Sequence, residues 1–221
     1  MPIDNIHLSK LLILMYCDRS KRITELRSLI RTSLRPTTAT NSSGGDFYTP
    51  FWADAKAHVY GEADLAQCVE ERIERSPQKR DLYPQLRDGF LLWWNERRRW
   101  TNAPFTRGRQ ISGRHPLVSL DATVKVGNLL IVEDGSGEER IMYPYFSPDT
   151  VLSEDAARLG LWLISEAFLD PPISEFRILD VFRGTAFSVD RTPFHGDESA
   201  EFHRRYRAIL VEYESLLTEY N

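Results

Sequence analysis

The chain has 221 residues, of which 42% are hydrophobic and 11% aromatic, so it can bury a core and global disorder is excluded. A formal net charge of −4 excludes a protein that binds nucleic acid or anionic membrane through overall basic charge, but it leaves room for a local basic patch. The spacing of Cys17 and Cys68 predicts neither a zinc site nor a disulfide framework, and the apolar run at residues 11–16 is too short to span a bilayer. We therefore expect a cytoplasmic protein with no membrane partner.

The N-terminal segment shows helical periodicity in two successive stretches. The apolar positions are Leu8, Leu11, Leu12 and Met15 in the first stretch and Ile23, Leu26, Ile30 and Leu34 in the second. Asp18-Arg-Ser20 supplies turn or cap chemistry between them, so residues 1–36 are predicted to form a helical hairpin. Residues 37–46 are polar and contain Gly44-Gly45, which predicts a flexible loop.

Residues 47–221 are predicted to form a single α+β core whose first part, residues 47–101, is helical. A helical region opens at Thr49-Pro50, is interrupted at Gly61 and ends at Ser76-Pro77. A further helix is predicted from Leu82 to Trp100, with an apolar face formed by Leu86, Phe90, Trp93 and Trp94.

Strands dominate after Pro116. Alternating or apolar runs predict strands at residues 118–126, 129–133 and 140–146, with turns at Gly127-Asn128 and at residues 134–137. Ser153 is a suitable N-cap for the next helix, a fourth strand follows at residues 176–183, and a long amphipathic helix ends the chain. We therefore predict an α+β protein with a helical N-terminal half packed on a small mixed β-sheet, and with the order β-β-β-α-β-α in residues 116–221.

This order of elements resembles the PD-(D/E)XK superfamily of restriction endonucleases and exonucleases. The resemblance implies an Asp at the second core strand and a Glu or Asp followed two residues later by Lys in the third. These carboxylates would hold Mg²⁺, and the lysine would help to activate water. In this chain residues 127–130 contain no carboxylate, and Tyr143 and Tyr145 stand at the positions of the acid and the lysine. Because a phenol is a poor ligand for a hard cation at neutral pH, we expect a nuclease-like fold with no catalytic residues, metal or cofactor.

Other carboxylates offer weak replacements for the missing motif. Asp121 alternates with apolar neighbours and is predicted on the exposed face of a strand, whereas Glu133 and Asp134 border a glycine turn. Asp180 lies inside an apolar strand and needs a partner, for which Arg183 and Arg177 are candidates. We favour a structural salt bridge over a catalytic role.

Two groups of residues are candidates for binding. Trp93, Trp94, Trp100 and Phe105 are interleaved with six arginines, and arginine beside aromatic rings is typical of phosphate contact combined with base stacking. The alternative is a solvated helix face over core tryptophans. The candidate nucleic-acid-binding residues are Arg97, Arg98, Arg99, Arg107, Arg109 and Arg114. Tyr143, Tyr145 and Phe146 are either an interaction surface or part of an edge strand beneath the next helix.

The sequence supports three hypotheses about function. The first is a non-catalytic nuclease-like module that binds nucleic acid or a protein partner, within DNA processing or defence. The second is an adaptor domain with no nucleic-acid role, which uses the terminal helix or the surface at residues 143–146. The third is a metal-dependent nuclease with a displaced site that includes Asp121 or Asp180. The missing motif favours a binding protein over an enzyme, and the oligomeric state stays open.

Overall fold

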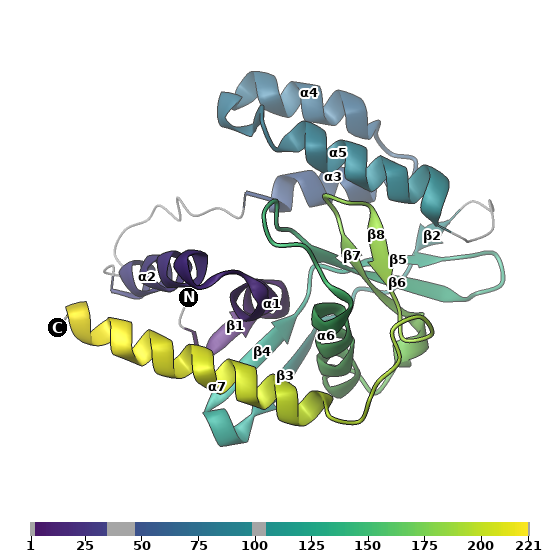
Figure 1. Ribbon diagram of the computed structural model, residues 1–221. Coiled ribbons are helices and arrows are strands. Elements are labelled where there is room, and N and C mark those ends of the chain that lie inside the picture. The colour runs from purple at the N-terminus through teal and green to yellow at the C-terminus, as the bar shows by residue number, and fades with distance from the viewer. Residues whose placement is uncertain (1–2, 35–46, 99–104, 221) are drawn as a thin grey trace.

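The computed structural model describes residues 3–34, 47–98 and 105–220, and within these ranges it is a mixed α+β protein with two separate β-sheets (Figure 1). The helices are α1 (Leu8–Tyr16), α2 (Arg19–Ser33), α3 (Thr49–Val59), α4 (Leu65–Arg75), α5 (Tyr83–Leu92), α6 (Glu154–Ala167) and α7 (Glu198–Leu217). The strands are β1 (Asn5–His7), β2 (Thr106–Arg107), β3 (Gly113–Leu117), β4 (Ala122–Val126), β5 (Leu130–Glu133), β6 (Glu139–Tyr145), β7 (Phe176–Asp180) and β8 (Thr185–Phe187). Over these ranges each helix is too short or too polar to cross a lipid bilayer.

The larger sheet has the strand order β2-β5-β6-β7-β8 among the described residues. Strands β6 and β7 are parallel and are joined through α6, as a parallel pair requires a crossover connection, while the other neighbours are antiparallel. In Figure 1 helices α3, α4 and α5 lie on one side of this sheet and α6 lies on the other. The sheet is therefore the middle layer of three.

Each face of the larger sheet contributes to its own hydrophobic core. Leu130, Val132, Met142 and Leu179 share one face and pack against aromatic residues of α3 and α5, among them Phe51, Trp52 and Phe90. The opposite face carries Ile131, Ile141, Tyr143 and Ile178, which join residues of α1, α6 and α7 in the second core. Apolar residues on both faces explain why the strands read as nearly continuous hydrophobic runs.

The smaller sheet has the order β1-β4-β3 and uses a strand that the sequence did not predict. Residues 5–7 pair in parallel with β4, with Ile6 opposite Val124, immediately before α1 begins. Both N-terminal helices contact α7, and Tyr206 of α7 donates a hydrogen bond to the carbonyl of Ile3. The two N-terminal helices thus pack on the C-terminal helix rather than chiefly on each other.

Several predicted elements are confirmed. The seven α-helices fall within the helical segments expected, and β5, β6 and β7 lie in the predicted strands. Ser153 caps α6 by accepting a hydrogen bond from the backbone N–H of Ala156, and residues 134–137 form the turn between β5 and β6. The α+β class is therefore confirmed, whereas the loop predicted at residues 37–46 lies outside the described ranges.

The predicted first strand, residues 118–126, is wrong in its first half. Val118–Leu120 form a 3₁₀ turn, and Asp121 is left-handed with φ 47°. The strand begins at Ala122 and follows β3, to which it is antiparallel. Asp121 is exposed as expected, but it lies in this turn and not on the face of a strand.

The hairpin predicted at Gly127-Asn128 is also wrong, because β4 and β5 belong to different sheets. The chain changes direction at Asn128, whose φ is 59°, and Trp52 Nε1 donates to its carbonyl at 2.6 Å. The three successive strands expected in one sheet are consequently divided, with β4 in the smaller sheet and β5 and β6 in the larger.

The extent of the helix predicted from Leu82 to Trp100 needs correction. Regular α-helix in α5 ends at Leu92 and is followed by one π-helical turn, Trp93–Arg97, after which Arg98 is extended with ψ 134°. The predicted continuation to Trp100 fails at Arg98, and residues 99–104 lie outside the described ranges. The terminal helix α7 packs against α1, α2 and α6, and those helices cover that side of the core.

Candidate anion-binding site

The predicted aromatic surface is wrong, because Tyr143 and Tyr145 are buried, with exposed fractions of 3% and 1%. Strand β6 is central in its sheet rather than at an edge, and both faces of it are covered. The hydroxyl of Tyr143 accepts from Ser9 N at 2.7 Å, and that of Tyr145 donates to the carbonyl of Thr150 at 3.0 Å. Burial raises the pKa of both phenols, so they remain neutral and structural.

The two neighbours of these tyrosines have equally structural roles. Phe146 is half-buried and stacks on Tyr48, with ring centroids 4.8 Å apart. Pro144 is tolerated in a central strand because the pairing with β5 ends two residues earlier, at Met142 opposite Leu130. The segment at residues 143–146 is thus part of the core.

The predicted arginine cluster does not form one patch. Arg107 in β2 is paired with Glu62, with Nε 3.2 Å from the carboxylate, and its guanidinium lies over the ring of Tyr60. Arg109 is paired with Glu139 and with Asp170, at 3.3 and 3.0 Å. The charge of both side chains is therefore balanced within the protein.

The remaining members of the predicted cluster separate as well. Arg114 is exposed on β3, in the smaller sheet, and Arg99 lies outside the described residues. Arg97 and Arg98 are held at the C-terminal end of α5. Trp93 and Trp94 are core residues, as the alternative interpretation required, but the two arginines are not a simple solvated face.

Arg97 and Arg98 line a pocket of about 240 Å³ together with arginines from distant parts of the chain. The described residues place five arginines around this pocket and one carboxylate, Asp190. Its floor is apolar and includes Trp93, Met142 and Ala186, and Ser188 completes the wall. We call the five side chains the arginine pocket: Arg97, Arg98, Arg140, Arg177 and Arg191.

Sheet register explains how Arg140 and Arg177 come together. Met142 of β6 lies opposite Arg177 of β7, and Arg140 precedes Met142 by two residues, so all three point to the same face of the sheet. That face carries α3–α5, and the two arginines lie at the end of it, beyond the apolar core. Alternation within each strand predicts the face, but the pairing of β6 with β7 could not be deduced from the sequence.

The π-helical turn places Arg98 in an unusual environment. Arg98 N donates to the carbonyl of Trp93 at 2.8 Å, and the guanidinium lies 3.6 Å from the centre of the Trp94 ring. Its Nη1 is buried and has no hydrogen-bond partner in the part of the chain that the structure describes. Burial lowers the pKa of Arg98, although an arginine stays protonated at any physiological pH. Short π-helical segments are frequently found at functional sites.

Arg177 is the pocket arginine that strand β7 contributes, and its guanidinium is partly buried. Burial lowers its pKa, Arg140 and Arg191 lower it further, and the nearby Asp190 opposes the shift. The pKa of Asp190 is itself lowered, mainly by a hydrogen bond from Ser188 and in part by Arg177 and Arg191. The carboxylate is therefore ionised, but one negative charge does not balance its cationic neighbours.

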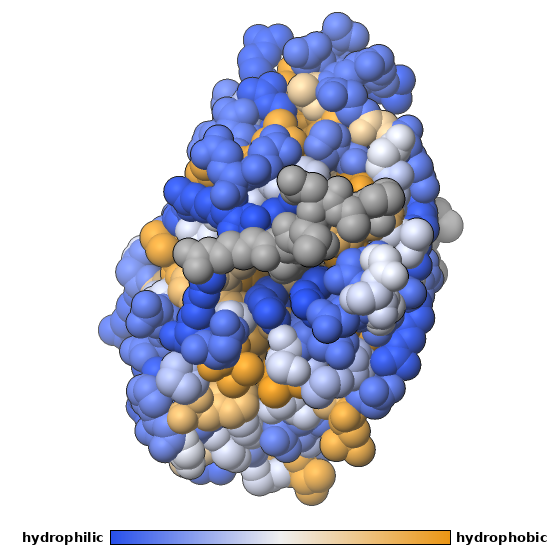
Figure 2. Space-filling model, turned by 90° about the vertical axis from the view of Figure 1, so that its right-hand side faces the viewer, coloured by the Kyte–Doolittle hydropathy of each residue, from blue (hydrophilic) through white to orange (hydrophobic). Residues whose placement is uncertain are grey.

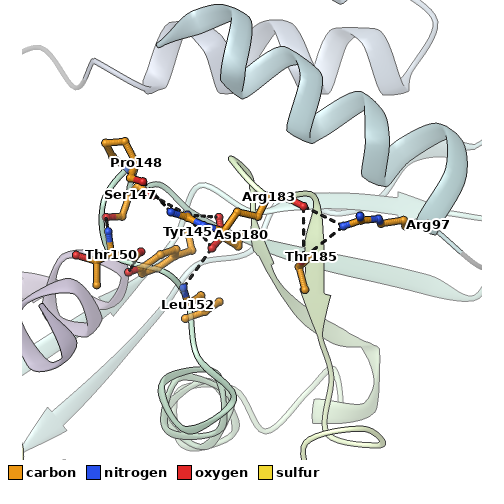
Figure 3. A network of polar contacts seen from close by, with 9 residues as sticks. All are labelled: Arg97, Tyr145, Ser147, Pro148, Thr150, Leu152, Asp180, Arg183 and Thr185. Carbon is orange, nitrogen blue, oxygen red and sulfur yellow. Dashed lines mark hydrogen bonds and ion pairs between the residues drawn. The ribbon is translucent and has the colours of Figure 1, made fainter. Parts of the chain in front are cut away.

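The turn between β7 and β8 holds Arg97, one of the residues that line the pocket, through hydrogen bonds (Figure 3). Nη1 of Arg97 donates to the carbonyls of Arg183 and Gly184 at 3.0 and 3.1 Å. Gly184 has φ 58°, and a side chain there would meet the carbonyl of Gly89 in α5. Close contact between helix and turn therefore requires glycine at both positions.

The same turn contains the ion pair between Asp180 and Arg183, which confirms the predicted salt bridge (Figure 3). The carboxylate of Asp180 also accepts from Leu152 N at 3.2 Å, and the guanidinium of Arg183 donates to the carbonyls of Ser147 and Pro148. Burial raises the pKa of Asp180, and these hydrogen bonds and the charge of Arg183 oppose that shift. Every polar contact of Asp180 is thus structural.

Figure 2 shows the face of the molecule that forms the right-hand side of Figure 1, where strongly hydrophilic residues lie above and below the grey atoms. Among the described residues no three His, Cys, Asp or Glu side chains gather as a metal-binding group. What the pocket offers is guanidinium donors and positive charge over an apolar floor, which is the chemistry of anion binding.

The chain matches no protein-family model, no curated protein and no solved structure. Its function is therefore inferred from the geometry of the pocket.

Proposed function

We propose that this protein is a nuclease-like module that lacks metal-dependent cleavage and binds nucleic acid by holding a backbone phosphate in the arginine pocket. The observation that carries this proposal is the grouping of five arginines with one carboxylate around a single cavity in the described structure. A reducing compartment such as the cytoplasm suits the two free thiols, Cys17 and Cys68.

Electrostatics supports an anionic ligand. Clustered like charges repel one another, and partial burial weakens their screening by water, so a bound anion would relieve the mutual repulsion of these arginines. The guanidinium fork matches the oxygens of phosphate better than any other side chain does. The buried, unpartnered Nη1 of Arg98 is a donor for which a phosphate oxygen would be a suitable acceptor.

A nucleic acid is favoured over a protein partner by what the other surfaces offer. The adaptor hypothesis relied on α7 or on the aromatic segment at residues 143–146. The apolar face of α7 is occupied, since Phe202, Tyr206 and Ile209 are buried in the core. Both surfaces expected for a protein partner are therefore used internally, whereas the arginine pocket is not. A role in DNA processing or defence follows from the resemblance to nucleases alone.

The test is the salt dependence of binding to labelled single-stranded and double-stranded DNA, measured by fluorescence anisotropy. We expect affinity to fall steeply with salt, because each neutralised phosphate contributes a slope of roughly −0.7 for single strands and −0.9 for duplex in log K against log salt. The double variant Arg177→Gln with Arg191→Gln should bind more weakly and with a shallower slope.

Arg114→Gln is the control for loss of a positive charge outside the pocket, because it changes the same residue type at an exposed site in the other sheet. It should bind as the unmodified protein does. Equal binding by the double variant would overturn the proposal, and so would DNA cleavage in Mg²⁺ or Mn²⁺ that is lost in Asp180→Asn. Circular dichroism of each variant establishes that it is folded.

A further inference from the structure

We infer that the arginine pocket selects a phosphate monoester, the terminal phosphate of a strand or nucleotide, over the phosphodiesters along a strand. This inference rests on the proposed function, because it names which phosphate of a nucleic acid the pocket holds.

The first reason is the shape of the site. Its volume of about 240 Å³ is below the range of roughly 300–1,000 Å³ that is typical of pockets for whole small molecules. Residues of the π-helical turn, of the neighbouring strands β6, β7 and β8 and of the segment after β8 all contribute to its wall. A cavity of this size, bounded by several elements, suits one phosphate group at a chain end better than a strand that passes through.

The second reason is the number of unused donors. Nη1 of Arg98 is buried without a partner, and over the described ranges Arg191 has no carboxylate within ion-pair distance. Arg177 uses Nη1 for the carbonyls of Ser174 and Phe176 and has further N–H groups available. Three arginines with free donors match the three terminal oxygens of a monoester, whereas a diester presents two non-bridging oxygens.

The third reason is charge. A phosphate monoester carries about −1.5 to −2 at pH 7, whereas a diester carries one negative charge. Arg140 is paired with Glu138, and Asp190 lies near both Arg177 and Arg191, yet Arg97, Arg98 and Arg191 form no ion pair with a carboxylate among the described residues. Trp93 and Met142, which line the site, are buried, and charges next to a buried apolar region attract an anion more strongly than charges surrounded by water.

The experiment compares oligonucleotides of one sequence that carry a 5′-phosphate, a 3′-phosphate or no terminal phosphate, with adenosine monophosphate and inorganic phosphate as competitors. We expect either the 5′-phosphorylated or the 3′-phosphorylated strand to bind at least about tenfold more tightly than the unphosphorylated strand. A gain in affinity of about tenfold is what one added charge-assisted hydrogen bond contributes. Arg177→Gln with Arg191→Gln should abolish this preference, and Arg114→Gln should retain it. The two phosphorylated arms identify which end is recognised.

The outcomes separate this inference from the proposed function. Equal binding of all three strands, with loss in the double variant, would overturn monoester selection and leave nucleic-acid binding standing. A preference that survives in the double variant would place the recognition elsewhere and also overturn it. If no oligonucleotide binds but calorimetry detects adenosine monophosphate in the unmodified protein and not in the double variant, the monoester site stands and the proposed function fails. If nothing binds, both fail.

Discussion

Arg97 and Arg183 are joined through the backbone, since Nη1 of Arg97 donates to the carbonyl of Arg183 at 3.0 Å. The side chain of Arg183 points the other way and holds the buried carboxylate of Asp180. One turn therefore connects an arginine of the pocket with an ion pair on the opposite side of the sheet. Changes at that ion pair are expected to reach the pocket only through this turn.

Arg183→Met should destabilise the protein by about 3 kcal/mol, because it leaves the charge of Asp180 buried without its partner. Burial raises the folded-state pKa of Asp180, so protonation favours the folded state, and the stabilisation present at acidic pH is lost as the pH rises through that pKa. The deficit of Arg183→Met should consequently be larger at pH 7 than in mild acid. Urea unfolding at the two pH values measures this loss in the free energy of unfolding.

The double variant Asp180→Asn with Arg183→Met is the control for the unpaired charge. It should be more stable than Arg183→Met alone, and the opposite ranking would contradict this account.

Gly89→Ala tests the close approach of α5 to the turn that carries Arg183. An added Cβ would overlap the backbone carbonyl oxygen of Val181, so the helix or the turn must move. Alanine in a helix interior would otherwise stabilise by up to about 1 kcal/mol, and we expect instead a loss of roughly 1–3 kcal/mol in the free energy of unfolding. Gly135→Ala, in the open hairpin turn with no atom nearby, is the control and should have little effect. A stabilised Gly89→Ala would show that the contact is looser than described.

The partly buried side chain of Lys56 should make the free energy of unfolding depend on pH. Burial, with a smaller effect of Arg107, lowers its pKa from 10.5 to about 8. Between these values the unfolded chain binds more protons than the folded one, so the stability of the protein increases as the pH rises. Lys56→Met removes the buried charge and should raise the melting temperature at pH 7, with a gain that shrinks toward about pH 9.5. A gain that is equal at both pH values would argue against the lowered pKa.

Tyr143→Phe separates a structural role from a binding role. It removes the hydrogen bond from Ser9 N to a buried hydroxyl and should cost about 1 kcal/mol in urea unfolding. DNA binding below the unfolding transition should be unchanged, because Tyr143 lies on the face of the sheet opposite the arginine pocket. Weaker DNA binding by folded Tyr143→Phe would return this residue to the list of candidate contacts.

The elements that could be predicted are those whose signal is local. Helical periodicity found α6 and α7, and the chemistry of Ser153 placed the start of α6 correctly. Strand β1 was missed because three residues before a helix carry no pattern of their own, and its partner Val124 is far along the chain. The hairpin at Gly127-Asn128 failed for a related reason, since local turn chemistry cannot tell which sheet each flanking strand joins.

The candidate site shows the same limit. Arg97 and Arg98 were found because they stand beside aromatic residues in sequence, which is a local signal. Arg140, Arg177 and Arg191 were missed because each looks like an ordinary strand or loop arginine until β6 pairs with β7. In contrast, Arg107 and Arg109 gave the same sequence signal, yet distant carboxylates neutralise them.

The pairing of β1 with β4 bears on how the chain is made as well as on its final form. Ile6 cannot form its native pairing until Val124 has been synthesised. Arg22 likewise cannot form its ion pair until Glu212 has been synthesised. During synthesis the first two helices therefore leave the ribosome without most of the surfaces that bury them. They must remain soluble until β4 and α7 have been made, so this region cannot complete its folding before those later elements have emerged.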